Sequence, residues 1–486
     1  MNILFATSEC APWVKTGGLG DVSAALPQAL AGLGHDVRVL MPAYGALGTL
    51  KSQAREWTDW PADGAWPAAR LGRVVRRGQF DLWLLDCPEL FADPGGPYQD
   101  TAGRDHTHNA RRFAFLARVA AQLAAGVVPA IAQAWRPDVL HCNDWPTALA
   151  PAWLAALRAQ ARIPTVVTIH NLAYQGLFPM EVVDTLALPP SWGTVEGAEF
   201  WGQLSYLKAG LVHADAITTV SPTYAREIRT EAFGCGLDGL LRAREADLSG
   251  ILNGIDAAQW DPATDTLIAQ RYDAEGWRAG KLANRRALRQ AMGLPGQRRG
   301  LLFGVVSRLA SQKGIDLIVD SLPWLIANDC QLAVLGSGDA VLQQRLQAAA
   351  AAHSAHVAVR IGFDETLAHL IEAGADAFLM PSRYEPCGLN QMYSQRYGTP
   401  PVVHGTGGLA DSVDDFVAAG PDAATGFVMP EASVPALQAA MAQALLVAKQ
   451  PAVWEAMCRR GMAREFGWDA SARAYVQLYE RLRHRR

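Results

Sequence analysis

The chain has 486 residues and a formal net charge of −4 at pH 7. This length exceeds what one hydrophobic core usually supports, so we expect two domains. Charged residues make up 19% of the chain, and their near-neutral balance argues against a polyanion-binding surface, which excludes a typical nucleic-acid partner. The seven cysteines include no C-x-x-C pair and are typical of reduced thiols in a cytoplasmic protein.

No membrane segment is expected. The N-terminus, MNILFATSEC, has neither the basic leader nor the apolar core of a signal peptide. The most apolar stretch, residues 119–135, is interrupted by Gln122, Gly126, Pro129 and Gln133, so it predicts a buried pair of helices and not a membrane span. We therefore predict a cytoplasmic protein without a membrane partner.

The first half opens with a strand, a loop and a helix. The run NILFATS predicts a buried strand, apolar residues at helical spacing over residues 22–33 predict a helix, and GLGHDVRVLMP supplies a glycine stop and a second strand. Pro27 lies inside the predicted helix and should kink it or end its first segment. Similar alternation continues along the whole chain and predicts an α/β fold with parallel sheets.

The same pattern starts again in GLLFGVVSRLASQKGIDLIV, which reads as strand, basic loop and helix. Asn, Gly, Asp and Pro cluster over residues 249–265, and we place the join between the domains there. We predict Rossmann-like domains over residues 1–250 and 251–464. Ligands of such sheets bind at the carboxyl ends of the strands, so two facing domains would form a deep cleft.

The loop WVKTGGLGDV in the first half matches neither G-x-G-x-x-G nor the P-loop pattern. No acidic residue ends the strand that follows it, so the sequence gives little support to dinucleotide binding. Backbone N–H groups at a helix N-terminus attract an anion, glycines allow its close approach, and Lys15 adds a full charge. An anion site and an ordinary glycine turn with an exposed lysine both remain open for this loop.

Two loops in the second half also suit an anion. Arg308 and Lys313 lie between a predicted strand and helix, and together they could neutralise a diphosphate. A further loop, HGTGGLADSV, offers the N–H groups of Thr406, Gly407 and Gly408 at the start of another helix. Because the chain contains no D-x-D motif, a metal clamp on a diphosphate has no obvious ligands, and we predict no metal.

Several polar residues follow predicted strands and are candidates for chemistry. Glu385, in SRYEPCGLNQ, could stabilise a cationic centre or bind sugar hydroxyls. Cys387 could be a nucleophile, but no histidine lies near it in the sequence, and a packed thiol is the better interpretation. Asp144 and His170 each end an apolar run and are candidates to line the predicted cleft, although a single histidine is more often a hydrogen-bonded core residue.

Taken together, these motifs resemble the bacterial glycogen synthase family, ADP-glucose-dependent glucosyltransferases that are similar to plant starch synthases. The segments KTGGLGDV, TIHNLAYQGLF, ITTVSPTYAREI, LNGID, VSRLASQKGIDLI, PSRYEPCGLNQMY and YGTPPVVHGTGGLADSV occur in the family's order and with similar spacing. The resemblance covers nearly the whole chain. It implies the GT-B fold of two facing Rossmann-like domains, a C-terminal helix at about residues 465–486 that crosses back to the first domain, and retention of anomeric configuration without metal or cofactor.

The same resemblance implies roles for individual residues. Lys15, Arg308 and Lys313 would bind the donor phosphates, and Glu385 would lie close to the donor glucose. The backbone carbonyl of His170 would stabilise an oxocarbenium-like transition state. The implied catalytic residues are Glu385, His170, Lys313 and Arg308. The implied substrate-binding residues are Lys15, Gly18, Asp21, Tyr98, Asp144, Asn171, Asn253, Phe363, Cys387, Gly388, Thr406, Gly407, Gly408 and Leu409.

The chain departs from the family pattern at a few positions. Asn143 and Pro146 stand where the family usually has histidines. Phe363 replaces a frequent tyrosine at the position that stacks on adenine, which keeps the ring and loses its hydroxyl. Related retaining transferases often carry a second glutamate eight residues after the first, where this chain has Tyr393. We therefore predict front-face substitution and not double displacement.

The resulting prediction is transfer of glucose from ADP-glucose to the non-reducing 4-hydroxyl of an α-1,4-glucan such as glycogen. Three alternatives remain open at this point. The first is a transferase of the same fold that uses UDP-glucose or a small acceptor. The second is a glucan-binding protein without catalysis that presents tryptophan side chains to sugar rings. The third, a nicotinamide oxidoreductase, is disfavoured because the dinucleotide fingerprint is missing.

Overall fold

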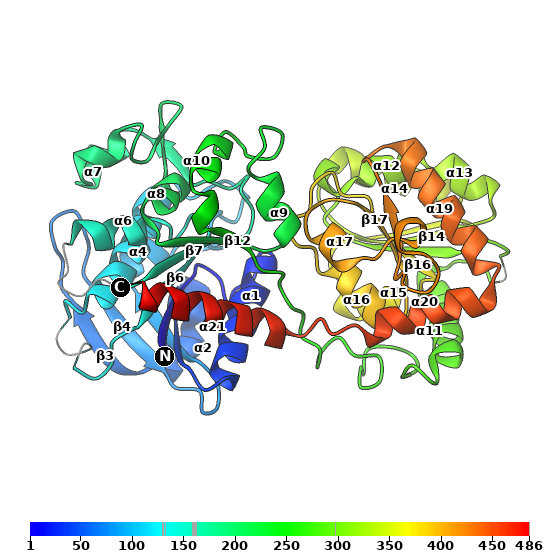
Figure 1. The fold of residues 1–486 in the computed structure, drawn as a ribbon, viewed down its shortest axis with the longest axis horizontal. Coiled ribbons are helices and arrows are strands. Elements are labelled where there is room, and N and C mark those ends of the chain that lie inside the picture. Colours follow the sequence, from blue (N-terminus) through cyan, green and yellow to red (C-terminus); the bar gives the residue numbers. More distant parts are fainter. Residues whose placement is uncertain (129–130, 132, 158–162, 297, 486) are drawn as a thin grey trace. The chain divides into compact units, whose positions relative to one another are not determined.

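The computed structural model describes residues 1–128, 131, 133–157, 163–296 and 298–485. The chain forms two compact units. The N-terminal unit contains Met1–Val220, Ala225–Asn253 and the segment that starts at Trp468, and the C-terminal unit contains Ser221–Tyr224 and Gly254–Gly467 (Figure 1). None of the helices in the described ranges is both long and apolar enough to cross a membrane.

The N-terminal unit is built on a large sheet with the strand order β12-β11-β7-β6-β1-β2-β5-β4-β3. Its strands are parallel except near one edge, where β4 pairs antiparallel with both of its neighbours, β5 and β3. A small antiparallel sheet, β8-β10-β9, accompanies it. The strand bounds are β1 (Asn2–Ala6), β2 (Asp36–Pro42), β3 (Arg55–Trp60), β4 (Ala69–Val74), β5 (Asp81–Asp86), β6 (Val139–Asn143), β7 (Thr165–Ile169), β8 (Leu177–Pro179), β9 (Glu199–Phe200), β10 (Gln203–Ser205), β11 (Ala216–Thr219) and β12 (Leu248–Gly250).

The helices of the N-terminal unit connect these strands. They are α1 (Gly18–Gly32), η1 (Gly45–Leu47), α2 (Gly48–Gln53), α3 (Pro88–Phe91), α4 (Asn109–Ala125), α6 (Leu149–Ala156), α7 (Val182–Thr185), η2 (Pro190–Gly193), α8 (Tyr206–His213), α10 (Asp238–Ala243), η3 (Glu245–Asp247) and α21 (Trp468–His484). A further helix, α9 (Pro222–Glu227), begins in the segment that belongs to the C-terminal unit.

The structure differs from the expectation for the first helix and describes only part of the predicted helix pair. Pro27 does not end the first helix, because α1 continues past it to Gly32. Pro27 is buried together with Leu26 and Leu30, and this packing offsets the one backbone hydrogen bond that proline cannot donate. The predicted helix pair over residues 119–135 starts within α4. This helix ends at Ala125, and the next residue, Gly126, has a left-handed backbone (φ 68°). The second helix of that pair falls partly on residues 129, 130 and 132, which lie outside the described residues.

The C-terminal unit has a fully parallel sheet with the order β15-β14-β13-β16-β17-β18. Its strands are β13 (Leu302–Val306), β14 (Gln331–Gly336), β15 (Val357–Ile361), β16 (Ala377–Met380), β17 (Pro401–His404) and β18 (Phe427–Met429). Its helices are α11 (Trp277–Met292), η4 (Ser311–Lys313), α12 (Ile315–Asp320), α13 (Leu322–Ala327), α14 (Ala340–Ala352), α15 (Glu365–Gly374), α16 (Asn390–Arg396), α17 (Gly407–Ser412), α18 (Phe416–Ala419), α19 (Val434–Ala448) and α20 (Pro451–Ala463).

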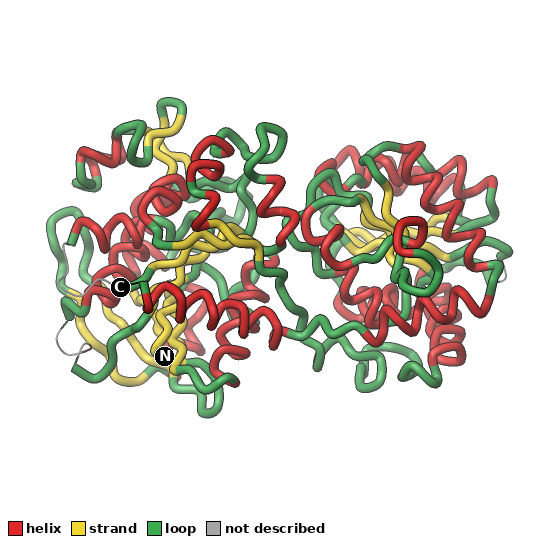
Figure 2. Tube along the Cα trace, in the orientation of Figure 1, coloured by secondary structure: helices red, strands yellow, loops and turns green. Residues whose placement is uncertain are grey.

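The parallel sheet of the C-terminal unit is buried on both faces. Phe303 and Val305 of β13 pack into one apolar cluster, whereas Leu302 packs into a second cluster on the opposite face. Successive side chains of a strand point to opposite faces, so an apolar run without alternation predicts this double burial. Figure 2 shows the strands of this unit enclosed by helices.

The strand orders identify where a ligand should bind in each unit. In each sheet the first strand in chain order lies in the interior, and later strands are added on both sides of it. β1 lies between β2 and β6, and β13 lies between β14 and β16. Connections leave in opposite directions at such a point, and ligands of open α/β sheets bind beside it at the carboxyl ends of the strands. A ligand is therefore expected beside the loops after β1 and β6 in the first sheet, and beside those after β13 and β16 in the second.

The last helix belongs to the N-terminal unit, as the resemblance predicted. Helix α21 packs against α1 (Figure 1). Its Tyr479 hydroxyl lies 2.7 Å from Nδ1 of the buried His141 on β6, and its Ser471 hydroxyl donates to the Leu252 carbonyl. Tyr475, Leu478 and Tyr479 of this helix are buried, which is the helical spacing expected of an amphipathic face.

Candidate functional site

The loop after β1 is organised by a carboxylate. Glu9 is only 2% exposed, and its Oε1 accepts hydrogen bonds of 2.6 Å from the hydroxyls of Thr16 and Tyr98. Its Oε2 accepts the Thr16 backbone N–H, also at 2.6 Å. All of these donors are uncharged. The side chain of Glu9 therefore fixes the KTGG loop onto the end of β1 and positions Tyr98 beside it.

The cation of this loop faces solvent. Lys15 is about half exposed and forms a 2.8 Å ion pair with Asp21 in the first turn of α1. A methyl group placed on Gly17 or Gly18 would meet no atom within 4 Å, so the space in front of the helix start is open. The loop thus presents a helix N-terminus, two side-chain-free positions and an exposed ammonium group, which together suit an anion.

The loops after β6 and β7 meet through Asp144 and His170. Asp144 adopts a left-handed backbone (φ 53°) directly after β6, and its Oδ1 accepts the backbone N–H of His170 at 2.7 Å. Burial raises the pKa of Asp144 to about 7, although the N–H groups of His170 and Asn171 oppose this shift. Burial lowers the pKa of His170 to about 3, so its imidazole is uncharged at neutral pH.

Asn143 explains one departure from the family pattern. Its Nδ2 donates to the Ala6 carbonyl at 3.0 Å, which orients the amide and leaves Oδ1 facing the His170 ring. His170 Nε2 lies 3.0 Å from that oxygen. Because an amide oxygen only accepts, Nε2 of the neutral imidazole must carry the proton. Asn143 therefore fixes the His170 tautomer and also links β6 to β1.

The two parts of the N-terminal site lie side by side. The rings of Tyr98 and Trp145 are 6.0 Å apart, and the negative charge of Glu9 contributes to the raised pKa of Asp144. Asn171 uses its Oδ1 to accept the Ala173 N–H and so shapes the turn after His170. The structure thus brings together the predicted residues at the ends of β1 and β6. Glu9 was missed from the sequence, although a carboxylate directly after a buried strand could have revealed it.

The C-terminal unit carries a buried ion pair at the corresponding place. Lys313 lies at the end of η4, after β13, and Glu385 follows β16. The distance between Lys313 Nζ and Glu385 Oε2 is 2.5 Å. The side chains are 19% and 7% exposed, and the Ser382 hydroxyl also donates to Glu385 Oε2 at 3.1 Å. Two strands that are adjacent in the sheet but distant in sequence therefore deliver a cation and a carboxylate to one point.

A glycine-rich loop packs against the backbone of Glu385. The Gly408 N–H donates to the Glu385 carbonyl at 3.1 Å. A methyl group on Gly407, which has a φ of 45°, would lie 1.9 Å from that carbonyl oxygen, and one on Gly408 would lie 2.1 Å from the Cys387 carbonyl oxygen. Only glycine allows this approach. Thr406 and Leu409 are buried next to it, so the predicted 406–409 loop and the Glu385 loop form one structure.

Other predicted residues lie further from this point. Arg308 is exposed and contacts Gln312 at 3.4 Å, without a bond to Glu385. Phe363 follows β15 and is 80% exposed. Cys387 is buried, which agrees with a packed thiol. Asn253 is buried at the end of the N-terminal segment, where its Oδ1 has no hydrogen-bond partner. Gly388 (φ 71°) packs beside Leu409 and the Gln391 side chain.

Tyr393 occupies the position of the expected second glutamate, and its environment is aromatic. Its ring stacks on Trp260 with centroids 3.9 Å apart and an interplanar angle of 11°. The His369 ring also stacks on Trp260, with centroids 3.8 Å apart. The side chain at this position therefore stabilises the packing of α16 against the segment that carries Trp260.

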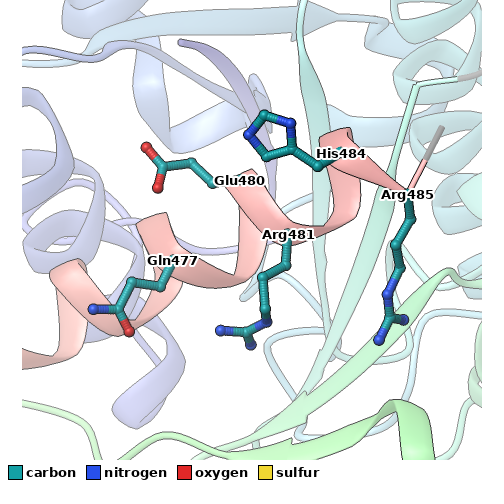
Figure 3. A pocket seen from close by; sticks show the side chains of 5 residues that line it. All are labelled: Gln477, Glu480, Arg481, His484 and Arg485. Carbon is teal, nitrogen blue, oxygen red and sulfur yellow. The ribbon is translucent and has the colours of Figure 1, made fainter.

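Two further features lie apart from the predicted residues. A hollow of about 530 Å³ is lined by Gln477, Glu480, Arg481 and His484 of α21 and by Arg485, which follows the helix (Figure 3). None of these five side chains belongs to the predicted catalytic or substrate-binding sets. Among the described residues, no group of three or more His, Cys, Asp or Glu side chains is placed to hold a metal ion.

Comparison with known proteins decides the family. Residues 2–243 match the starch synthase catalytic domain, and residues 285–459 match the glycosyl transferases group 1 family. The chain is 53% identical to the glycogen synthase of Aromatoleum aromaticum over 99% of this chain and 97% of the relative. It is 54% identical to the glycogen synthase of Paracidovorax citrulli over 100% of this chain and 96% of the relative. The chain belongs to the glycogen synthase and starch synthase family. It is a glycosyltransferase, and the oxidoreductase and non-catalytic alternatives are thereby excluded.

Solved structures agree with membership of the glycogen synthase and starch synthase family. The catalytic domain of starch synthase IV from Arabidopsis thaliana, bound to ADP and acarbose, is 30% identical with a TM-score of 0.85 and 99% coverage of both chains. Sucrose-phosphate synthase from Thermosynechococcus elongatus is 18% identical with a TM-score of 0.59, over 100% of both chains, and shows only that the fold is shared. The predicted GT-B type of fold, with two Rossmann-like domains, is confirmed.

Proposed function

We propose that this glycosyltransferase moves glucose from ADP-glucose to the non-reducing 4-hydroxyl of an α-1,4-glucan, with retention of anomeric configuration. The observation that carries the proposal is the buried pair of Lys313 and Glu385 beside the strand-order reversal of the C-terminal sheet. The similarity to a starch synthase bound to ADP and acarbose supports an ADP-linked donor and a glucan acceptor.

The donor diphosphate would be held by cations and backbone amides. Lys313 and Arg308 both follow β13, and the backbone of Gly407 and Gly408 closes against the Glu385 loop. We assign Lys15 to the same phosphates. Cations and oriented N–H groups stabilise a leaving diphosphate through charge, and this is the main contribution a protein makes when little covalent chemistry is required of it.

We assign two groups to the reacting sugar, the Glu385 carboxylate and the His170 backbone carbonyl. An oxocarbenium-like transition state carries positive charge, which the Glu385 carboxylate and a carbonyl dipole stabilise. The low pKa of His170 keeps its imidazole neutral, so it adds no opposing charge. The bond from the His170 N–H to Asp144 holds the backbone at this position. Preorganised groups of this kind lower the barrier because they need no rearrangement during the reaction.

The proposed chemistry is a front-face substitution. The bond between glucose C1 and the β-phosphate oxygen breaks, the acceptor 4-oxygen bonds to C1 on the same face, and the acceptor proton passes to the leaving phosphate oxygen. Double displacement would need a nucleophilic carboxylate on the other face. Tyr393, the residue eight positions after Glu385, is instead packed on Trp260, which supports the single-step route.

A donor comparison tests this proposal. Purified protein is supplied with glycogen and either ADP-glucose or UDP-glucose carrying labelled glucose, and incorporation into polymer is measured. We expect incorporation from ADP-glucose and release of the label by β-amylase, which cleaves α-1,4 bonds from non-reducing ends. No incorporation, or a preference for UDP-glucose, would overturn the donor assignment. We place this reaction in the cytoplasm, a proposal supported by the scattered positions of the seven cysteines in the sequence.

A further inference from the structure

The segment that forms the small sheet of the N-terminal unit exposes several large apolar side chains. Twelve large hydrophobic residues are exposed in the described chain, and four of them lie within residues 174–201. These are Trp201 (84% exposed), Val195 (68%), Tyr174 (54%) and Leu177 (41%). A tryptophan as exposed as Trp201 is unusual because large aromatic side chains are generally buried.

The backbone at Trp201 breaks a local rule of turn chemistry. Phe200 pairs with Gln203 across the hairpin of β9 and β10, so Trp201 and Gly202 form a two-residue turn. Both have positive φ, 50° and 78°, which is the pattern of a type I′ turn that favours Asn-Gly. A bulky residue in this conformation is a true outlier, and such strain is characteristic of functional sites.

The tryptophan ring is supported from behind. Phe200 meets it edge to face, with centroids 6.4 Å apart and an angle of 83°. A methyl group placed on Gly236 would lie 3.3 Å from Trp201 Nε1 and 2.9 Å from the Phe200 ring, so the backbone of Gly236 lies against both rings. Glu199 accepts the Gly202 N–H at 2.7 Å through Oε1. These contacts hold the indole in place while most of its surface stays in water.

The loop that follows the candidate site leads to the same place. Tyr174 lies four residues after His170, and the adjacent Gln175 donates through Nε2 to the Cys235 carbonyl at 2.9 Å. Gly236, which contacts Trp201, is the next residue. A continuous set of contacts therefore connects the backbone at His170 with the exposed indole, within one unit of the chain.

We infer that Trp201, with Tyr174 on the neighbouring loop, forms a surface site for the α-1,4-glucan acceptor, separate from the reacting centre. The inference rests on the proposed function. The apolar face of a glucose ring stacks on a flat indole, and exposed polar groups beside the ring bind its hydroxyls. Here Gln203, which follows the turn, and Glu196, five positions before Trp201, are both exposed. A protein partner would instead require a continuous apolar area, which these polar residues interrupt.

The residue preference of the turn provides a variant that removes the ring without destabilising the hairpin. Trp201→Asn removes the ring and installs the residue that the turn prefers, so the hairpin should be at least as stable as before. Trp201→Phe keeps an aromatic face. Val341→Asn, on α14, serves as a matched control because Val341 is also exposed (63%) and lies in the other unit.

Glycogen binding at the proposed surface site can be measured in two ways, by steady-state kinetics and by retardation in native gels without catalysis. Trp201→Asn should raise KM for glycogen about tenfold and weaken retardation in glycogen-containing native gels to a similar degree. Its kcat, its KM for ADP-glucose and its KM for maltotriose should match the wild type, because a short acceptor needs only the reacting centre. Trp201→Phe and Val341→Asn should behave as wild type in both measurements.

A chemical probe reports on the site directly. Cys235 is the exposed cysteine among the seven, and the other six are buried. Maltoheptaose should slow alkylation of Cys235 in the wild type and have no effect in Trp201→Asn. Equal glycogen retardation of wild type and Trp201→Asn would overturn the inference, as would a loss of self-association with unchanged glycogen binding. If the wild type transfers no glucose yet shows Trp201-dependent retardation, the surface site stands and the proposed function fails.

Discussion

The two halves of the chain deliver charge to equivalent places in opposite ways. In the N-terminal unit, Glu9 follows β1 and is satisfied by uncharged donors, while the nearby cation, Lys15, is half exposed. In the C-terminal unit, the cation and the carboxylate are joined as a buried pair, Lys313 with Glu385. Both places lie beside the strand-order reversal of their sheet.

The two arrangements suit different roles, although both units share the same strand–loop–helix pattern. The neutral hydrogen bonds of Glu9 fix a loop without using a cation, so Lys15 is available to an incoming anion once it leaves Asp21. The Lys313–Glu385 ion pair is largely shielded from water, so it can interact strongly with charge that develops on a substrate. The first arrangement suits recruitment of the donor, and the second suits stabilisation of the reacting centre.

The largest expected effect comes from breaking the buried pair. Lys313→Met leaves the Glu385 carboxylate buried without its cation and should cost about 3–5 kcal/mol of stability, with kcat lowered about 10³-fold. Adding Glu385→Gln removes the unpaired charge, so the double variant should regain most of its stability but no activity. Thermal unfolding and steady-state kinetics check both. A double variant as unstable as Lys313→Met would contradict the ion-pair account.

The next effect tests the glycine loop behind Glu385. Gly407→Ala would place a methyl group 1.9 Å from the Glu385 carbonyl oxygen at a φ of 45°, and should destabilise the protein by about 3–5 kcal/mol through overpacking and left-handed strain. Gly293→Ala is the matched control, because its φ is 69° and nothing lies within 4 Å. The control should cost only about 1–2 kcal/mol. Equal losses of stability in urea unfolding would show that the close contact does not matter.

A pH dependence should distinguish the N-terminal unit. Burial raises the pKa of Asp144 from its ordinary 3.8 to about 7. The protonated form is therefore favoured in the folded state, and this contribution is complete below about pH 4 and lost as the pH rises to about 7. Relative to Asp144→Asn, the wild type should lose roughly 2–4 kcal/mol of unfolding free energy across that window. Hydrogen exchange of N-terminal peptides checks this, and a constant difference would refute it.

The smallest effect on stability is expected at Lys15. Its ion pair with Asp21 is exposed, so Lys15→Ala should change the unfolding free energy by less than about 0.5 kcal/mol. If the ammonium group binds donor phosphate, KM for ADP-glucose should rise about tenfold or more. The exposed Lys449 provides the control, and Lys449→Ala should alter neither quantity. An unchanged KM for Lys15→Ala would remove Lys15 from the donor site.

The sequence predicted the parts of the fold that depend on local patterns. Strand, basic loop and helix at residues 302–320 follow from apolar runs, a glycine and two cations that are close in sequence. Pro27 was expected to kink the first helix or end its first segment, and the ending is wrong because α1 continues to Gly32 with Pro27 buried. Local preference is a weak guide when a segment is held by its neighbours.

The partners of the site residues could not be predicted in the same way. Glu9 meets Tyr98 and Lys313 meets Glu385 across 89 and 72 positions of sequence, so these contacts exist only once the sheets have formed. The tautomer of His170 depends on the orientation of the Asn143 amide, which the Ala6 carbonyl fixes. The stacking of Tyr393 on Trp260 is likewise a long-range contact. The types of the site residues follow from the sequence, whereas their partners follow from the topology of the sheets.

We propose that the Glu385 carboxylate stabilises the transition state of glucose transfer. The most direct test of this proposal is the steady-state kinetics of Glu385→Gln with ADP-glucose and glycogen, on protein shown to be folded by its unfolding transition. We predict that kcat falls about 10²–10³-fold while KM for ADP-glucose stays within about threefold, because the lost interaction belongs to the transition state. An unchanged kcat would contradict the claim.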